Sequence, residues 1–254
     1  MKKYGGFLTL VRQELYRFFR LIRQTIFPPV ITTLLFILIF GYSLGDRIHE
    51  IHGFAYILYI IPGLAAMGVI NNAYTNTSTS IYMSKFDQSF DNIWVTPLRP
   101  TEMVAAIVIG GIVRGLLIGI ITLAVALLML HTPIQHLFFT LVLFLLQSII
   151  FGCWGIISAL RAKSWDTLAT TQNFILTPMS YLAGVFYSID LLPSPWKTIS
   201  MFNPLFYMVD ATRFGVLGIH DAPLWLSFGI TFTLAAGLFM LCIYLFHIGY
   251  KLVK

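Results

Sequence analysis

The residues best able to do chemistry are histidines and carboxylates that lie outside the apolar segments. His49 and His52 are separated by two residues in the sequence, a spacing that allows both imidazoles to reach one metal ion. The other candidates in neighbouring loops are Asp46, Glu50, His131, His136 and His220. Loop histidines placed by chance are far commoner than metal sites, so we expect no bound metal and no catalytic residue. An integral-membrane enzyme with an external His-containing metal site stays as an alternative.

Nucleotide and proton chemistry both lack their usual residues. No glycine is followed by Lys-Ser or Lys-Thr, so the phosphate-binding Walker A pattern is absent. If ATP and Mg²⁺ drive this protein, we expect another chain to bind them. No Asp or Glu lies well inside an apolar segment, whereas proton-coupled carriers usually need a buried carboxylate or histidine relay. Cys153 and Cys242 lie within apolar runs and are expected to be small core residues.

Composition places these residues in a membrane protein. The chain has 254 residues, of which 58% are hydrophobic and 10% charged, against about 25% charged in a soluble domain. We predict an all-α integral membrane fold in one domain, since a span needs roughly 20 apolar residues. The six predicted spans are Pro28–Gly45, Phe54–Ser80, Val104–Leu130, Gln135–Leu160, Thr167–Ser188 and Pro223–His247.

The basic residues predict the orientation. Of the 16 Lys and Arg residues, twelve lie on the side that holds both termini, three lie on the other side, and Arg114 is inside a span. Because cytoplasmic loops carry the excess of Lys and Arg, both termini are expected to be cytoplasmic. The net charge of +6 therefore gives no reason to expect a nucleic-acid partner.

Two cytoplasmic segments are expected to be amphipathic helices. Phe7–Gln24 has an apolar face opposite several arginines and should lie in the headgroup layer. Within Ser84–Met103, the helical spacing of Phe86, Phe90 and Trp94 gives an apolar stripe beside Asp87 and Asp91, and Pro97 ends the helix. Mixed charges around an apolar face favour a protein partner; the alternative is a solvated loop on the membrane.

Polar and small residues inside the spans suggest where helices meet. Gly111, Gly115 and Gly119 lie on one helix face and allow close packing, either within the subunit or between subunits. Polar side chains gather at the cytoplasmic ends of the second and fifth spans and are expected to line a vestibule; interhelical hydrogen bonding is the alternative. The residues proposed for the path are Asn72, Asn76, Thr170, Asn173, Thr177 and Tyr181.

The external loop after the fifth span contains two short helical patterns, Pro195–Phe202 and Pro204–Gly218. At about 1.5 Å per residue neither can cross a bilayer, so we expect them to dip back into the outer leaflet. The break falls at Asn203-Pro204, where Asn203 can cap the second helix. Asp210 and Arg213 have the spacing of a pair on one helix face.

NPLFYMVDATRFGVLG, from Asn203 to Gly218, resembles the C-terminal signature of ABC-2 type transporter permeases. QTIFPPVITTLLFILIFG, FAYILYIIPGLAAMGVINNAY and LTPMSYLAGVFYSIDLLP are also similar to that family. The resemblance implies a six-helix permease that forms a homodimer and works with two copies of a separate ATPase. It also implies an interface helix at Phe7–Gln24, a coupling helix within Ser84–Leu98 and re-entrant helices within Pro193–Gly218.

Together these features predict an export permease of the bacterial inner membrane, driven by ATP hydrolysis in a partner subunit. Many aromatic residues and the lack of an intramembrane acid favour a lipid-like or amphipathic substrate. An ATP-independent channel is a further alternative, which flux without ATP would reveal. The coupling residues are expected to be Asp87, Phe90, Asp91 and Trp94.

Overall fold

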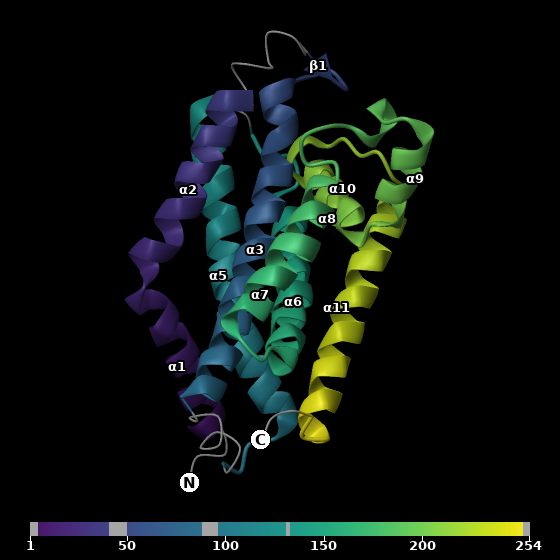
Figure 1. Ribbon diagram of the computed structural model, residues 1–254. Coiled ribbons are helices and arrows are strands. Elements are labelled where there is room, and N and C mark those ends of the chain that lie inside the picture. The colour runs from purple at the N-terminus through teal and green to yellow at the C-terminus, as the bar shows by residue number, and fades with distance from the viewer. Residues whose placement is uncertain (1–4, 41–49, 88–95, 131–132, 251–254) are drawn as a thin grey trace.

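The apolar segments fold into long helices in a computed structural model, which describes residues 5–40, 50–87, 96–130 and 133–250 (Figure 1). The longer helices are α1 (Gly5–Arg20), α2 (Ile22–Leu38), α3 (Tyr56–Phe86), α5 (Pro100–Leu130), α6 (Leu137–Arg161), α10 (Pro204–Leu217) and α11 (Leu224–His247). The shorter ones are α7 (Trp165–Thr171), a π-helical stretch (Gln172–Leu176), α8 (Thr177–Tyr181), a 3-10 turn (Ile189–Leu191) and α9 (Ser194–Phe202). Strands β1 (Glu50–Ile51) and β2 (Phe54–Ala55) form a small antiparallel hairpin, with Ile51 opposite Phe54.

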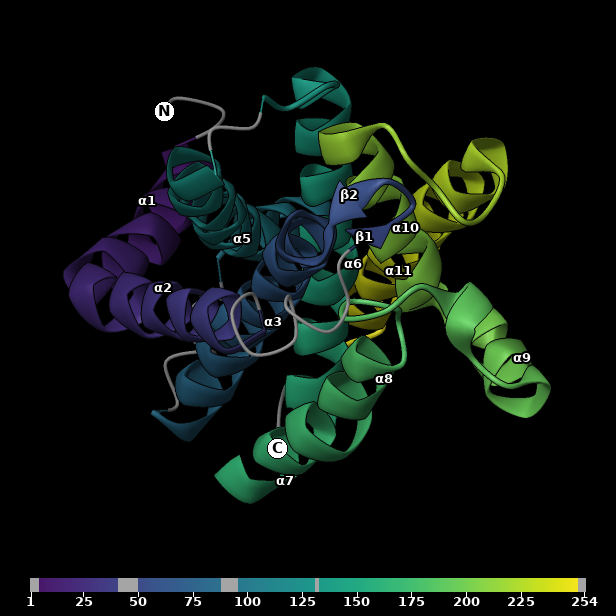
Figure 2. The same cartoon turned by 90° about the horizontal axis from the view of Figure 1, so that it is seen from above.

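Helix α3 is the centre of the fold. It packs mainly against α5 and α6, and the view from above shows it surrounded by the other long helices (Figure 2). The glycine row faces this contact: a Cβ added at Gly111 would lie 2.8 Å from Thr77 Cγ2, and one at Gly115 would lie 2.6 Å from Ser148 Oγ. The row therefore serves close packing within the subunit, because only glycine leaves room for these neighbours.

Four described helices are long and apolar enough to cross a membrane: Tyr56–Phe86, Pro100–Val125, Leu137–Arg161 and Leu224–His247. A fifth is added if α1 and α2, which meet at a 60° bend, are counted as one broken span. They match the second, third, fourth and sixth predicted spans. The fifth predicted span contains only the short run α7 to α8, and the chain turns after Tyr181, where Gly184 adopts a φ of 73°. Six crossings therefore stay a prediction.

The prediction that Pro28 and Pro29 begin the first span was wrong. Both prolines lie inside α2, which starts at Ile22 directly after the bend from α1. Helix α1 has the predicted amphipathic pattern, and its buried residues are Leu10, Glu14 and Phe18. This face packs along α5, so much of the apolar face contacts protein.

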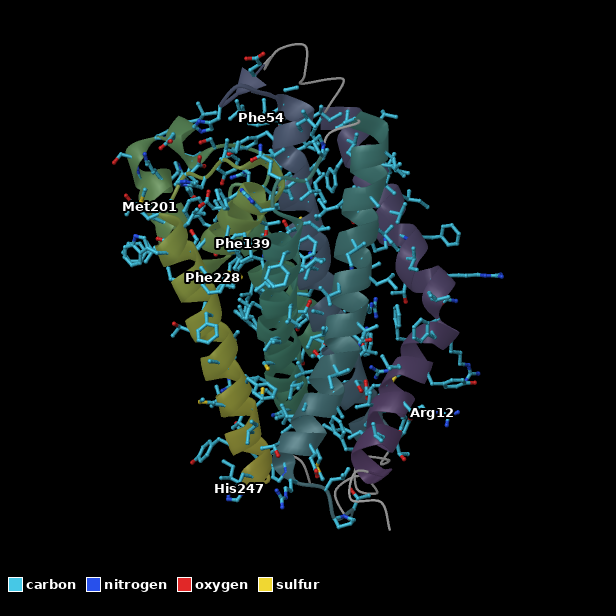
Figure 3. The ribbon with its side chains drawn as sticks, turned by 180° about the vertical axis from the view of Figure 1, so that it is seen from behind. Arg12, Phe54, Phe139, Met201, Phe228 and His247 are labelled. Carbon is cyan, nitrogen blue, oxygen red and sulfur yellow. The ribbon has the colours of Figure 1, made fainter. Side chains whose placement is uncertain are left out.

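The two ends of the molecule are distinct. The first turns of α1 and the last turn of α11 lie at one end, and the β hairpin lies at the other, as the labels His247 and Phe54 show from behind (Figure 3). Helices α9 and α10 lie toward the hairpin end (Figure 1). The predicted break between them is confirmed: Asn203 Oδ1 accepts a hydrogen bond from the backbone N–H of Leu205 at 3.0 Å, which caps α10.

Candidate functional site

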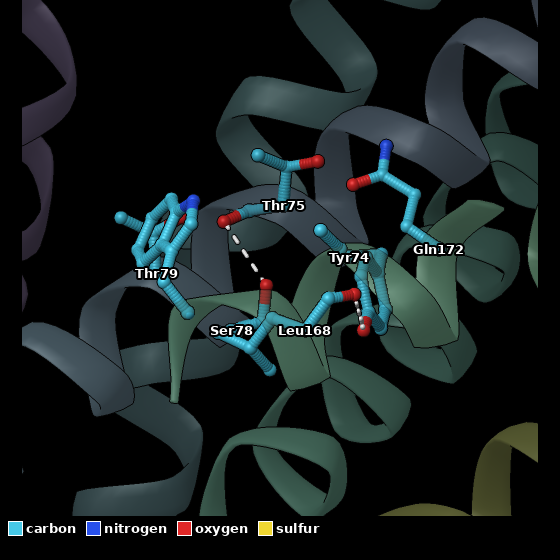
Figure 4. A pocket seen from close by; sticks show the side chains of 8 residues that line it. Tyr74, Thr75, Ser78, Thr79, Leu168 and Gln172 are labelled. Atoms are coloured by element: carbon cyan, nitrogen blue, oxygen red, sulfur yellow. Dashed lines mark hydrogen bonds between the residues drawn. The ribbon is translucent and has the colours of Figure 1, made fainter. Parts of the chain in front are cut away.

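A small cavity opens between α3 and the α7 region, toward the end opposite the hairpin. Its volume is about 70 Å³, and its lining residues are Tyr74, Thr75, Ser78, Thr79, Trp165, Leu168, Ala169 and Gln172 (Figure 4). The Tyr74 hydroxyl donates to the carbonyl of Leu168 at 3.4 Å, which joins the two walls. The lining combines the polar side chains of Thr75 and Gln172 with apolar ones such as Leu168 and Ala169, so the cavity suits a few water molecules or part of an amphipathic group.

The six residues predicted for the path are not brought together at this cavity. Asn72 and Asn76 are buried beside α1 and α5, on another face of α3. Thr170, Asn173 and Tyr181 are exposed on the outside of the subunit. Thr177 donates to the carbonyl of Gln172 at 3.0 Å, within the π-helical turn. Their role in transport stays a prediction. Composition identified both polar stretches. Only the structure shows that the helices are rotated so that Thr75 and Gln172 line the same cavity.

A second polar cluster joins α1 to α3 and α5. Glu14 is 6% exposed, and its two oxygens accept from Arg17 Nη2 at 2.8 Å and Ser80 Oγ at 2.6 Å. Arg17 also donates to the carbonyl of Asn76 at 3.1 Å. One turn away, Arg114 Nε donates to Asn72 Oδ1 at 3.2 Å. Glu14 was not among the predicted site residues, although it is a carboxylate on the otherwise apolar face of an amphipathic helix.

The expected pairing of Asp210 with Arg213 needs correction. Both side chains are buried, and each is directed to a different partner. Asp210 accepts hydrogen bonds from the backbone N–H groups of Asp221 at 2.6 Å and Ala222 at 3.2 Å. Burial raises the pKa of Asp210, although these two bonds and the nearby Arg213 favour its charged form. The carboxylate therefore holds the turn that leads into α11.

Arg213 lies buried near the hairpin end of the molecule and joins several segments there. It is 1% exposed, donates to the carbonyl of Gly184 at 2.6 Å, and lies 4.0 Å from the centre of the Tyr59 ring. Its Nη1 atom is 3.8 Å from Asp221 Oδ2. Since Tyr59 is on α3 and Gly184 follows α8, this one side chain joins three regions of the chain. Helical spacing favoured Asp210 as the partner, because Asp221 is distant in sequence.

Asp221 also connects to the β hairpin. Its oxygens accept from Ser188 Oγ at 3.2 Å and lie 3.3 Å from His52 Nε2. His52, Asp190 and Asp221 offer ligand atoms within 4.8 Å of one another. Both carboxylates already face cations, Lys197 at 2.7 Å from Asp190 and Arg213 beside Asp221. Ion pairs therefore account for this group.

Two other histidines pack elsewhere. His136 and His220 both contact the ring of Phe214, with ring centroids 5.0 and 5.7 Å apart. They are therefore placed by aromatic packing at the start of α6 and the end of α10. His49, the other half of the predicted metal pair, and Asp46 lie outside the described residues, as does His131.

The predicted coupling residues are only partly described. Asp87 is exposed at the end of α3, whereas Phe90, Asp91 and Trp94 lie outside the described residues. The flanks on both sides are anchored. Lys85 Nζ donates to the carbonyl of Leu160 at 3.1 Å, and Leu98 packs on Gly6 of α1. Any force on this segment would therefore reach α1, α3, α5 and α6.

Comparison with known proteins gives a consistent assignment. The sequence model of the ABC-2 type transporter family matches residues 5–217. The inner membrane transport permease YadH of Escherichia coli K12 is 38% identical over 230 residues, which is 91% of this chain and 90% of that protein. Nodulation protein J of Rhizobium leguminosarum bv. viciae is 24% identical over 209 residues, 81% of this chain and 76% of that protein.

Proposed function

This chain belongs to the ABC-2 type transporter family and is a multi-pass permease subunit of the inner membrane, and we propose that it exports an amphipathic, lipid-like substrate. Membership of the family implies a partner ATP-binding subunit. In this proposal two copies of that subunit bind ATP and Mg²⁺, and this chain supplies the path without a cofactor of its own. Both termini face the cytoplasm, because most basic residues lie on that side.

One observation carries the direction of transport. The cavity between α3 and α7 lies in the half of the molecule away from the β hairpin, the half that the basic residues assign to the cytoplasm. The other end is tightly packed around the buried side chain of Arg213 and its contacts with Tyr59, Gly184 and Asp221. A cavity on the cytoplasmic side and a tightly packed external end are what we expect of a subunit that loads from the cytoplasm or the inner leaflet, as an exporter requires.

The surroundings of the cavity support an amphipathic substrate. Trp165 at its rim is 47% exposed, and Phe174 and Tyr181 further along the same run are 77% and 45% exposed. These rings offer apolar contact while Thr75 and Gln172 offer hydrogen bonds inside the cavity. A volume of about 70 Å³ is too small for a whole lipid. The proposal therefore requires the path to widen between two subunits.

A homodimer would provide that wider path. Thr170 and Asn173 are exposed on the α7 region together with Asp166, although polar groups at membrane depth face protein or water. We place this surface against the second copy of the chain. Single cysteines at Thr170 or Asn173 should then cross-link between subunits, whereas a cysteine at Thr233 on the exposed face of α11 should not.

The test is reconstitution of the permease with its copurifying ATPase in liposomes that contain a quenchable fluorescent phospholipid. We expect ATP-dependent movement of the probe between leaflets, lost when Thr75→Trp fills the cavity and retained in Thr233→Trp. Movement without ATP would instead assign a channel. ATP hydrolysis without movement of any lipid probe would reject the lipid-like substrate.

A further inference from the structure

The junction of α1, α3 and α5 holds more positive charge than its partners neutralise. The three charged residues there are Glu14, Arg17 and Arg114. Glu14 receives hydrogen bonds from Arg17 at 2.8 Å and Ser80 at 2.6 Å, one on each oxygen. Arg114 forms no ion pair with a carboxylate of the described residues, and its hydrogen bond to Asn72 Oδ1 involves only Nε. Among the described residues, one cation is therefore left without a counter-ion.

The arrangement also places like charges near each other. Arg17 donates to the carbonyl of Asn76 and Arg114 donates to the side chain of Asn72, so the two guanidinium groups bind neighbouring turns of α3. A cation at membrane depth is costly and is usually paired or used for binding. Since Glu14 compensates only one of the two arginines, a bound anion would balance the unpaired charge.

A second donor at the junction lacks an acceptor. Asn76 is 3% exposed, and its Nδ2 group has no hydrogen-bond partner. It lies beside Gly110, where an added Cβ would be 3.1 Å from Asn76 Nδ2 and 3.3 Å from Glu14 Oε2. A buried amide N–H without an acceptor costs about 1–3 kcal/mol. The junction therefore has an unused donor beside its excess positive charge.

The depth of the junction fits a lipid headgroup. Helix α3 begins at Tyr56, and roughly 20 residues at about 1.5 Å each span the hydrocarbon core and end near Asn76. Arg17 contacts Asn76 at that level, and Arg114 contacts Asn72 one turn deeper. Helices α1 and α2 lie at the edge of the subunit, with their 60° bend in this region (Figures 1 and 2). Lipid phosphates of the cytoplasmic leaflet can approach at this edge.

We propose that Arg114, Arg17 and Asn76 form a binding site for the phosphate of an anionic lipid in the cytoplasmic leaflet. The two guanidinium groups donate charge-assisted hydrogen bonds to phosphate oxygens, and Asn76 Nδ2 donates a third. Glu14 accepts from Arg17 and Ser80, so Arg17 would be shared between this carboxylate and the anion. The site is separate from the cavity at α7, which lies on another face of α3, and does not depend on the proposed transport substrate.

The test uses the full chain, stripped of lipid and placed in nanodiscs of phosphatidylcholine with or without phosphatidylglycerol. Native mass spectrometry counts the phosphatidylglycerol molecules retained by each chain. We expect Arg114→Gln to weaken retention at least about tenfold, because it removes a charge-assisted contact. Arg12→Gln also removes one positive charge, but from an exposed position on α1, and should leave retention within about twofold of the wild type.

Asn76→Asp guards against a folding artefact, because it keeps the side-chain shape and replaces the free donor with a competing carboxylate. It should also weaken retention while the thermal unfolding midpoint in phosphatidylcholine stays near that of the wild type. A separate titration with inorganic phosphate distinguishes the source: saturable binding that Arg114→Gln abolishes, without preference for phosphatidylglycerol, would assign the site to a free phosphate. Wild-type retention by both variants, or no retention by the wild type, would overturn the proposal.

Discussion

At the scale of single residues, burial determines how much the ion pair of Arg213 contributes to the stability of the subunit. An exposed ion pair contributes about 0–1 kcal/mol, whereas removing one partner of a buried pair costs about 3–5 kcal/mol. With Arg213 only 1% exposed and Asp221 beside it, we expect Arg213→Gln to lower the thermal unfolding midpoint of the purified subunit strongly. Lys197→Gln breaks the exposed pair with Asp190 and is the matched control.

The comparison has a clear contrary outcome. If Arg213→Gln and Lys197→Gln shift the unfolding midpoint equally, the buried network does not stabilise the hairpin end. A double-mutant cycle with Asp221→Asn would separate the pair from the contacts that Arg213 makes with Gly184 and Tyr59. Coupling close to zero would assign the stabilisation to those other contacts.

The same residue shows why the sequence was only partly informative. Local rules predicted the cap at Asn203 and the helix break before Pro204, because both depend on neighbours in the chain. The partner of Arg213 depends on how the turn before α11 folds back over α10, which spacing along one helix does not encode. For this reason Asp221 and Tyr59 were overlooked while Asp210 and Arg213 were recognised.

At the scale of elements, the glycine row explains how α5 approaches α3 and α6. Alanine normally favours a helix over glycine by up to about 1 kcal/mol. At Gly115 the added methyl would meet Ser148 at 2.6 Å, so Gly115→Ala should instead destabilise the subunit by about 1–3 kcal/mol. Gly237→Ala in α11 meets nothing within 4 Å and should be neutral or slightly stabilising. Chemical or thermal unfolding in detergent measures both, and equal effects would contradict tight packing at the row.

The helices also show which features of the fold average hydropathy can and cannot predict. Long uniform segments such as α6 and α11 agree with their predicted ranges, because a membrane span is a property of composition. The fifth predicted span was apolar enough on average, yet it contains a π-helical turn and stops at Tyr181. Its end depends on packing against α3 and α10, and the positive φ of Gly184 then reverses the chain. Average hydropathy contains no information about either.

At the scale of the whole molecule, the predicted orientation can be tested with described residues. Lys163 lies between α6 and α7, and Lys197 lies in α9, toward opposite ends of the helices. A cysteine at Lys197 should react with a membrane-impermeant thiol reagent in intact cells, whereas one at Lys163 should react only after lysis. The native Cys153 and Cys242 are buried and should stay silent. Labelling of the Lys163 position from outside would reverse the proposed topology and the direction of export.

One segment between α3 and α5 would receive force from the ATPase. Residues 84–98 connect α3 to α5, and their flanks contact α6 through Lys85 and α1 through Leu98. A segment that is anchored at both flanks can transmit a conformational change of the ATPase only if its middle part binds the ATPase. Phe90 and Trp94 are the expected anchors, since interface energy concentrates in a few buried aromatic residues, each worth about 2 kcal/mol or more.

We therefore expect Trp94→Ala to weaken copurification of the ATPase, while Asp91→Arg should leave a folded subunit with poor ATP-driven transport. Asp91 and Asp87 would meet basic residues of the partner and act more on encounter and register than on affinity. Leu98→Ala is the informative control, because it keeps the anchors but loosens the contact with Gly6 of α1. It should preserve ATPase binding and reduce transport. If the combined Phe90→Ala and Trp94→Ala variant binds the ATPase and transports normally, force must enter through α1 or the α6–α7 turn instead.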